Sequence, residues 1–348
     1  MERFTRTWLR AFRLRAGVVL TVLIALACAP SPLLAASPYK SVRLFGVDYV
    51  EAQDFGNRFG LTGTWIEAQK QMRLKNAINR FELTVHSVDA SLNGVRIFLG
   101  EPVVLRGGKL YLSKGDAEEL LGPILSGNSG ERHSPVRTIV IDAGHGGADP
   151  GNQNSRLKLN EKTFTLDVAR RLERILNAQG FKVVMTRKSD RAVDLDRRAE
   201  ISNKAKADLF ISIHFNAFNR SAVAGTETYV MTPRNLRSSP QAERDDSMVR
   251  TNYPANQHDR WNALLGYQMH RALVTQLNSF DRGFKRFRYS VLRSVNCPAV
   301  LVEAAFLSND AEGKKVSSPA YRQKIAESIA RGVQQHATVR KRTTPKKG

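Results

Sequence analysis

From residue 137 onward, short apolar runs alternate with longer amphipathic stretches, and this alternation constrains the fold more than any other feature of the chain. Short apolar runs separated by stretches with helical spacing indicate strands joined by helices. That order is typical of a mostly parallel sheet covered by helices on both faces. We therefore predict an α/β fold with a mainly parallel twisted sheet. The expected strands are residues 137–141, 181–186, 209–213, 226–230 and 299–302, and the expected helices are 161–179, 195–205, 261–278 and 320–335.

Ionisable side chains stand where three of these strands end. The first strand runs into "AGHGG" with His145, "LFISIH" ends at His214, and "AVLVE" ends at Glu303. In open sheets of this kind, ligands bind beyond the carboxyl ends of the strands. We expect these three side chains to converge at one edge of the sheet, although each alone reads as a satisfied histidine or a surface carboxylate.

Glu161 is a fourth candidate, at the first position of the helix that follows the first strand, with Asn160 as the expected N-cap. A carboxylate at a helix N-terminus is favoured by the helix dipole, which gives Glu161 a purely structural interpretation. However, Glu161 also heads the apolar stripe formed by Phe164, Val168 and Leu172. A carboxylate on a core-facing stripe needs a partner, and a metal ion would serve.

Two histidines and one carboxylate are a common zinc set for hydrolysis, because they leave the fourth position to water. A further glutamate that does not bind the metal can move the proton from that water to the leaving nitrogen. His145, Glu161 and His214, together with Glu303, have this composition. Their spacing differs from the HExxH helix motif, so a different fold from that of thermolysin is expected.

Seven segments stand in order within residues 137–337: "IVIDAGHGGADPGNQ", "NEKTFTLDVARRL", "TRKSD", "DRRAEISN", "DLFISIHFNA", "GTETYV" and "PAVLVEAAFLSN". Together they resemble the type-3 zinc-dependent N-acetylmuramoyl-L-alanine amidases, a family of bacterial cell-wall hydrolases. The resemblance implies one Zn²⁺ per catalytic domain, held by His145, Glu161 and His214, with Glu303 as the catalytic residue. It also implies the scissile bond, which is the amide between the muramic acid lactyl group and L-alanine of peptidoglycan.

The chain departs from the family pattern at two places, Ala304-Ala305 before Phe306 and Ser202 before Asn203, both by exchange of small residues. Asn216 and Arg198 are our candidates for contacts with substrate. For Arg198 the alternative is an internal ion pair with Asp190 or Asp194.

The polar segment between Val230 and Trp261 is expected to form a loop that shapes the substrate groove. Three acidic residues in it could alternatively reach the metal: Glu243, Asp245 and Asp246.

Residues 38–122 read as a separate small α+β domain. We expect a short helix at 50–59 and strands at 64–74, 81–88, 95–99, 103–105 and 110–112. The pattern resembles the copper-amine-oxidase N-terminal-like domain, although a single histidine, His86, is too little to hold copper. Docking on the wall or on a partner is the expected role. Residues 123–136 are rich in Gly, Ser and Pro and read as a linker.

Residues 1–36 resemble an export signal, because a basic stretch precedes a short apolar run, 16–29, and several small residues. A lipid anchor at Cys28 and an uncleaved membrane anchor are the alternatives. Cys297 is the only other cysteine, which excludes an intramolecular disulfide in a processed chain. The expected location is the periplasm or the cell envelope.

The formal net charge is +22, and residues 338–348 form a basic tail. A basic balance favours an anionic partner, although a solvated basic surface explains it as well. With an export signal, peptidoglycan and peripheral contact with anionic membrane lipids are favoured and nucleic acid is not. An envelope activator protein and a monomeric state are also expected.

Two other functions remain open from sequence. One is a non-catalytic protein that binds or regulates peptidoglycan, and the presence of all four site residues argues against it. The other is a zinc peptidase that acts within the stem peptide, which only the family resemblance disfavours.

Overall fold

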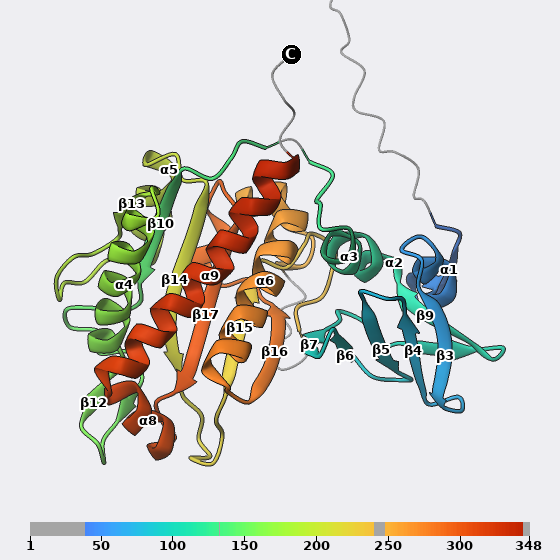
Figure 1. Ribbon diagram of the computed structural model, residues 1–348, viewed down its shortest axis with the longest axis horizontal. Helices are drawn as coiled ribbons and strands as arrows, with labels where there is room; N and C mark the ends of the chain where they lie inside the picture. The colour runs from blue at the N-terminus through green and yellow to red at the C-terminus, as the bar shows by residue number, and fades with distance from the viewer. Residues whose placement is uncertain (1–38, 132, 240–247, 344–348) are drawn as a thin grey trace, which may run out of the picture. The chain divides into compact units, whose positions relative to one another are not determined.

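The computed structural model describes residues 39–131, 133–239 and 248–343. All described elements belong to one compact unit, Tyr39–Gly348 (Figure 1). The expected export signal with Cys28 lies outside the described residues, as do Glu243, Asp245 and Asp246. Among the described helices, none is long and apolar enough to cross a membrane.

The predicted α/β fold is confirmed, and in the part of the sheet built from residues 138–306 parallel pairs lie on both sides of one antiparallel pair. Five strands match the predicted ones: β10 (Thr138–Ala143), β13 (Lys182–Met185), β14 (Leu209–Asn216), β15 (Thr226–Val230) and β17 (Ala299–Phe306). Adjacent strands pair in parallel in the order β13-β10-β14-β17, and β17 then pairs antiparallel with β15. A sixth strand that the sequence analysis missed, β16 (Asp281–Arg286), pairs in parallel with β15.

Helices cover both faces of this sheet, as the apolar runs predict. On one face lie α4 (Glu161–Ala178), α6 (Asp259–Leu277), α8 (Asp310–Ser317) and α9 (Pro319–Thr343), and Figure 1 shows α6 and α9 side by side across the strands. On the other face lie α5 (Leu195–Lys204) and α7 (Ser290–Arg293). Because side chains alternate along a strand, β10 sends Ile139 and Ile141 into the core beneath α4 and α9, and Val140 into the core beneath α5 and α7.

The N-terminal strands extend the same sheet. The strand β7 (Val95–Phe98) pairs with β16 through Ile97 and Phe284. Beyond it, β6 (Asp89–Leu92), β5 (Arg80–Thr84), β4 (Gln71–Lys75) and β3 (Thr62–Glu67) follow as antiparallel neighbours. A separate four-stranded sheet has the order β1 (Ser41–Leu44), β2 (Val47–Glu51), β9 (Lys109–Ser113), β8 (Val104–Arg106). A two-stranded sheet pairs β11 (Gln153–Asn154) with β12 (Leu159–Asn160).

Several element boundaries in this region differ from the prediction. The expected strand 64–74 is a hairpin, because the chain turns between Glu67 and Gln71. The expected helix 50–59 is α1 (Ala52–Asn57), preceded by β2, and the expected strand 81–88 ends as β5 at Thr84. The expected linker begins in a helix, α3 (Gly122–Ser126), which follows α2 (Lys114–Asp116) and a π-helical turn at Ala117–Leu121. The domain boundaries themselves remain predictions.

Candidate metal centre

The three predicted ligands stand on the elements that the sequence assigns to them. His145 follows the end of β10, His214 lies on β14, and Glu161 is the first residue of α4. Because β10 and β14 are parallel neighbours, both histidines lie at the same edge of the sheet. The Asn160 backbone is extended as an N-cap requires, but its side chain makes no capping hydrogen bond.

Glu161 joins the two imidazoles. Its side chain is fully buried, and its Oε1 lies 2.8 Å from Nδ1 of His214 while its Oε2 lies 3.1 Å from Nε2 of His145. The two rings lie 4.9 Å apart, nearly perpendicular to each other. One potential ligand atom from each residue falls within 4.8 Å of the others. The structure therefore brings all three predicted ligands together.

Backbone amides fix the orientation of the Glu161 carboxylate. The amide of Phe215 donates to Oε1 at 3.0 Å, and the amide of Asn152 donates to Oε2 at 2.8 Å. Burial raises the pKa of Glu161, but hydrogen bonds and charge from both histidines outweigh burial and lower that pKa to about 2. Glu161 is therefore an anion ready to accept a cation.

Two glycines leave the space that the imidazoles occupy. A Cβ at Gly144 would lie 2.3 Å from Cε1 of His214. A Cβ at Gly151, where φ is +65°, would lie 2.6 Å from Cδ2 of His145 and 2.7 Å from Oε2 of Glu161. Any larger residue would push into the three predicted ligands, so close approach requires glycine at both positions, and at Gly151 the left-handed backbone requires it as well.

Asp149 holds His145, the first predicted ligand, by a contact that the sequence did not indicate. Its Oδ2 lies 2.7 Å from Nδ1 of His145, and its Oδ1 accepts the amide of Gly151 at 3.0 Å. A carboxylate on the far nitrogen of a ligating histidine fixes the ring and its tautomer. The pairing of Asp149 with His145 is local, four residues apart, but it depends on the left-handed backbone at His145, where φ is 60°.

Arg198 takes part in holding the loop before His145. It is buried, and its Nη1 donates to Asp142 Oδ1 at 2.7 Å and to the carbonyl of Ala143 at 2.8 Å, while Nη2 donates to the carbonyl of His145 at 3.0 Å. The expected alternative, an internal ion pair, is therefore present, but Asp190 and Asp194 are the wrong partners. Asp142 lies on β10, three residues before His145, whereas Asp190 pairs with Lys162.

Arg187 holds the same loop from its other side. It is fully buried, with Nε donating to the carbonyl of Ala143 at 2.9 Å and Nη2 donating to the carbonyl of Gly144 at 2.9 Å. The two guanidinium groups together satisfy the carbonyls of three consecutive residues that leave the strand. These hydrogen bonds restrict the conformation of a loop that holds several glycines.

Glu303 lies beside the ligand set but outside it. In β17 it pairs with His214 on one side and with Glu227 on the other. It is 9% exposed, and its Oε2 has no hydrogen-bond partner among the described residues. Burial, and then the negative charges of Glu161 and Glu227, raise the pKa of Glu303 well above its ordinary value. Glu303 is thus a buried carboxyl group next to the candidate metal ligands, and no described residue engages its Oε2.

Asn216, the second candidate for a substrate contact, makes bonds within the protein. Its Nδ2 donates to Oε2 of Glu227 at 3.0 Å, and its Oδ1 accepts the amide of Ala217 at 2.8 Å. A role in binding substrate remains a prediction for Asn216 and for Arg198.

A groove of about 530 Å³ opens onto the metal centre. His145 and His214 line one side, and the loop before α5 with its first residues, 192–196, lines the other. The two imidazoles are 24% and 17% exposed, whereas Glu161 is fully covered. A ligand in this groove would therefore meet the outer faces of the histidines.

The donor chemistry fits zinc. Two imidazole nitrogens and one carboxylate make up a typical catalytic zinc set with an open fourth position. The three groups already face one another around a shared centre, and the two glycines keep that centre accessible. His145, Glu161 and His214 would hold the ion.

Comparison with known proteins gives a family for this part of the chain. The family model described as N-acetylmuramoyl-L-alanine amidase matches residues 139–335, more than half of the chain. The match starts after the N-terminal strands, so their resemblance to the copper-amine-oxidase N-terminal-like domain remains a prediction.

The relatives carry the same description. The N-acetylmuramoyl-L-alanine amidase AmiC of Neisseria meningitidis is 34% identical over 229 residues, which cover 60% of this chain and 54% of the relative. The amidase of the same name from Escherichia coli is 30% identical, over 64% of this chain and 58% of the relative. The solved catalytic domain of CwlV, from Bacillus (Paenibacillus) polymyxa, is 30% identical, over 58% of this chain and 99% of that domain, with a TM-score of 0.48.

The chain spans between about a third and just over half of the length of the first curated relatives it matches. The family model nevertheless covers all four predicted site residues. The chain belongs to the N-acetylmuramoyl-L-alanine amidase family.

Proposed function

We propose that this protein hydrolyses the amide bond between N-acetylmuramic acid and L-alanine in peptidoglycan. Membership of the amidase family supports the reaction class. The observation that carries the proposal is the convergence of His145, Glu161 and His214 next to Glu303, whose Oε2 has no partner among the described residues. The reaction breaks the carbonyl carbon–nitrogen bond and forms a carbon–oxygen bond from water. Its products are a lactyl carboxylate on the glycan and a free amino group on the peptide.

We assign to His145, Glu161 and His214 the binding of one Zn²⁺. When bound, zinc supplies Lewis-acid polarisation of the carbonyl and lowers the pKa of a water molecule. Glu303 takes a proton from the attacking water on its carboxylate and delivers it to the departing alanine nitrogen. Asp149 keeps the His145 ring in the orientation that binding requires, and Arg187 and Arg198 hold the loop on which it stands.

The groove in front of the two histidines is the proposed binding site for the lactyl–alanine segment of substrate. It is open and runs past the start of α5, so a polymer can enter without being threaded through the protein. An open groove of this kind suits the lactyl–alanine amide, because this bond lies in a side branch of a long glycan chain. Arg198 lines the same groove, and a contact from Arg198 or Asn216 to the stem peptide remains part of the proposal.

We further propose that the protein acts in the periplasm or cell envelope, as a monomer that contacts peptidoglycan and anionic lipid surfaces. The export-like start of the sequence and the net charge of +22 support this location. An activator protein of the envelope would bind outside the metal centre. Docking of residues 38–122 on the wall or on such a partner belongs to the same proposal.

The test uses intact peptidoglycan sacculi and mass analysis of the released products. Free stem peptides and peptide-free glycan chains are expected from the wild-type protein, and both are lost on chelation. Glu303→Gln should lower the release rate about 10²–10⁴-fold, because proton transfer to the leaving group is lost. Glu327→Gln is the matched control, since Glu327 lies on α9 and accepts a hydrogen bond from Gln323 in an exposed pair.

Two outcomes would overturn the proposal. Release by Glu303→Gln or His145→Ala at the wild-type rate would indicate that the site is not catalytic, as in a wall-binding protein. Cut peptides that remain attached to muramic acid would show cleavage within the stem peptide, and the protein would then be a zinc peptidase.

A further inference from the structure

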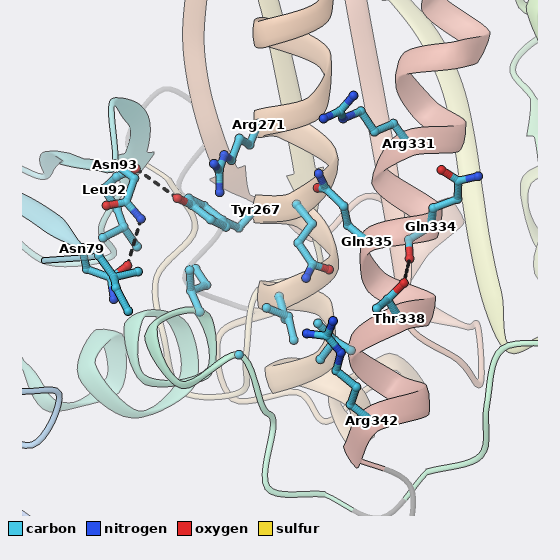
Figure 2. Close-up of a pocket in the computed structure, with 16 residues that line it drawn as sticks. Asn79, Leu92, Asn93, Tyr267, Arg271, Arg331, Gln334, Gln335, Thr338 and Arg342 are labelled. Carbon is cyan, nitrogen blue, oxygen red and sulfur yellow. Dashed lines mark hydrogen bonds between the residues drawn. The ribbon is translucent and has the colours of Figure 1, made fainter.

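A second groove lies on the opposite face of the sheet from the metal-centre groove. Its walls are α6 and α9, together with the turns that join β4 to β5 and β6 to β7 (Figure 2). Its volume is about 730 Å³, and we call it the α6–α9 groove. Its lining residues are Ile78, Asn79, Leu92, Asn93, Ile124, Gly127, Leu264, Tyr267, Gln268, Arg271, Arg331, Gln334, Gln335, Thr338, Val339 and Arg342.

The charge of this groove is wholly positive. Arg271, Arg331 and Arg342 line it, and no aspartate or glutamate is among the described lining residues. The three arginines also form no ion pair with any carboxylate in the described parts of the chain. Figure 2 shows Arg331 and Arg342 pointing from α9 towards α6. Three guanidinium groups without anionic partners around one cavity indicate an anionic ligand.

The remaining polar lining consists mostly of carboxamides. Asn79 and Asn93 are bonded to each other at 3.0 Å, and Tyr267 donates to the carbonyl of Leu92 at 3.1 Å, so this wall is already ordered. On the helices, Gln268, Gln334 and Gln335 present amide groups that both donate and accept. Such groups suit hydroxyl and acetamido substituents. Ile78, 84% exposed at the rim, offers an apolar contact for the face of a sugar ring.

The groove is also elongated along α9. Arg331 and Arg342 are eleven residues apart on one face of this helix, a rise of about 16 Å. One small anion would reach only one end of such a row. A chain with anionic groups at intervals would reach both ends, and a concave groove holds a chain better than it holds a flat lipid surface.

We propose that the α6–α9 groove binds a glycan strand whose lactyl groups carry free carboxylates. The inference rests on the proposed function, because hydrolysis of the lactyl–alanine amide leaves one such carboxylate at every cleaved position. The guanidinium groups would pair with the carboxylates, and the carboxamides would contact the sugars. The groove would thus hold the stripped part of a strand while the metal centre, on another face, meets positions that still carry peptide.

Binding of glycan chains to the full-length Glu303→Gln protein tests the inference without turnover. The probes are peptide-free glycan chains prepared with an unrelated amidase, the same chains with their carboxyl groups converted to amides, and phosphatidylglycerol vesicles. The groove variant carries Arg271→Gln, Arg331→Gln and Arg342→Gln. The control variant removes the same charge from exposed residues elsewhere, through Arg174→Gln, Lys204→Gln and Lys314→Gln.

The groove variant should bind free-carboxylate glycan at least about tenfold more weakly than the protein without these three substitutions, because each lost charge-assisted hydrogen bond reduces the binding free energy. The control variant should change by less than about twofold, the size expected of screened surface charge. Amidation of the glycan should weaken its binding to the protein without groove substitutions by the same factor as the triple substitution does. It should not weaken glycan binding to the groove variant any further. Thermal unfolding reports whether each variant is folded, and Arg331→Gln alone provides a milder variant.

Equal losses in the groove and control variants would overturn the inference, as would unchanged binding of amidated glycan. Groove-dependent binding of the vesicles but not of the glycan would also overturn it. These results are independent of the proposed function. Wild-type protein that releases no stem peptide but binds stripped glycan through the groove would refute the hydrolysis alone.

Discussion

Glu227 and Glu303 face each other directly across the antiparallel pair β15–β17, and both are buried. The two carboxylates differ in their partners. Glu227 accepts hydrogen bonds from Lys285 at 2.7 Å, Arg282 at 2.9 Å and Tyr229 at 2.7 Å, whereas Oε2 of Glu303 has no partner among the described residues. Glu227 is therefore an anion that stabilises the structure, whereas Glu303, opposite it, is the glutamate that we propose to take part in the reaction.

Removing the charge of Glu227 should destabilise the protein. Lys285 is 1% exposed on its side chain, and Glu227→Gln leaves this cation buried without its anion. We expect the free energy of unfolding to fall by about 3 kcal/mol, as for other broken buried pairs. Chemical denaturation measures it.

The matched control is Glu67→Gln, because Glu67 pairs with Lys70 at 2.8 Å on the surface. That change should cost less than about 0.5 kcal/mol. Glu227→Gln combined with Lys285→Met should recover part of the loss, because the fully buried cation is removed together with its anion, whereas Arg282, the other cation that pairs with Glu227, is partly exposed to water. A double variant as unstable as the single one would contradict this account.

Substitution of Gly144 should abolish metal binding while leaving the fold in place. The methyl group of Gly144→Ala would lie 2.3 Å from the His214 ring, so the ring must leave the ligand set. We expect zinc content, measured by elemental analysis after dialysis, to fall from about one ion per chain to near zero. Gly180→Ala is the control for a substitution that strains the backbone without touching the site, because φ is +86° at Gly180 and no atom lies within 4 Å of the added Cβ. Full zinc content in Gly144→Ala would show that the histidine is not a ligand.

Asp149 should contribute to metal affinity without touching the metal. Asp149→Ala removes the acceptor 2.7 Å from Nδ1 of His145. Loss of such an outer contact should weaken zinc binding about 10–100-fold. Competition with a chromogenic chelator measures the change, with Asp48→Ala as an exposed control on β2. An unchanged affinity would mean that the loop alone orients the ring.

Stability should fall in mild acid because of His336. Burial, and then the charges of Arg340 and His133, lower the pKa of His336 well below 6.5. The ring is fully buried beside Trp261, with Nδ1 bonded to Gln268 at 3.0 Å. Below pH 6.5, His336 becomes protonated in the unfolded chain but stays neutral in the folded protein. The stability contributed by neutral His336 is therefore present above pH 6.5 and is lost as the pH falls below it.

Below pH 6.5, His336 is expected to contribute up to about 1.4 kcal/mol per pH unit to the slope of the free energy of unfolding against pH. Denaturant unfolding between pH 7.5 and pH 5 measures it, and His336→Gln should make the dependence shallower by that amount. An identical pH dependence in the variant would show that another group is responsible. His258, whose pKa burial also lowers, is the first alternative, and His258→Gln tests it.

The sequence by itself determined the alternation of strands and helices and pointed to the four residues of the candidate site. Hydrophobic period is a local property, and parallel strands place their carboxyl ends together, so the pattern alone assigns His145, His214 and Glu303 to one edge. Glu161 could be added because it heads the buried stripe of its own helix. The family motifs pointed to the same four positions.

Only the tertiary structure decided which groups surround them. Register placed Glu227 opposite Glu303, and side-chain packing gave Asp142 rather than Asp190 or Asp194 to Arg198. The strands β7 and β16 pair although they are far apart in the sequence, and Arg96 and Asp281, which are hydrogen-bonded between them, are 185 residues apart. This pairing also positions Asn79 and Asn93, which form one wall of the α6–α9 groove. Such pairings follow from the simultaneous packing of distant elements, which no local period encodes.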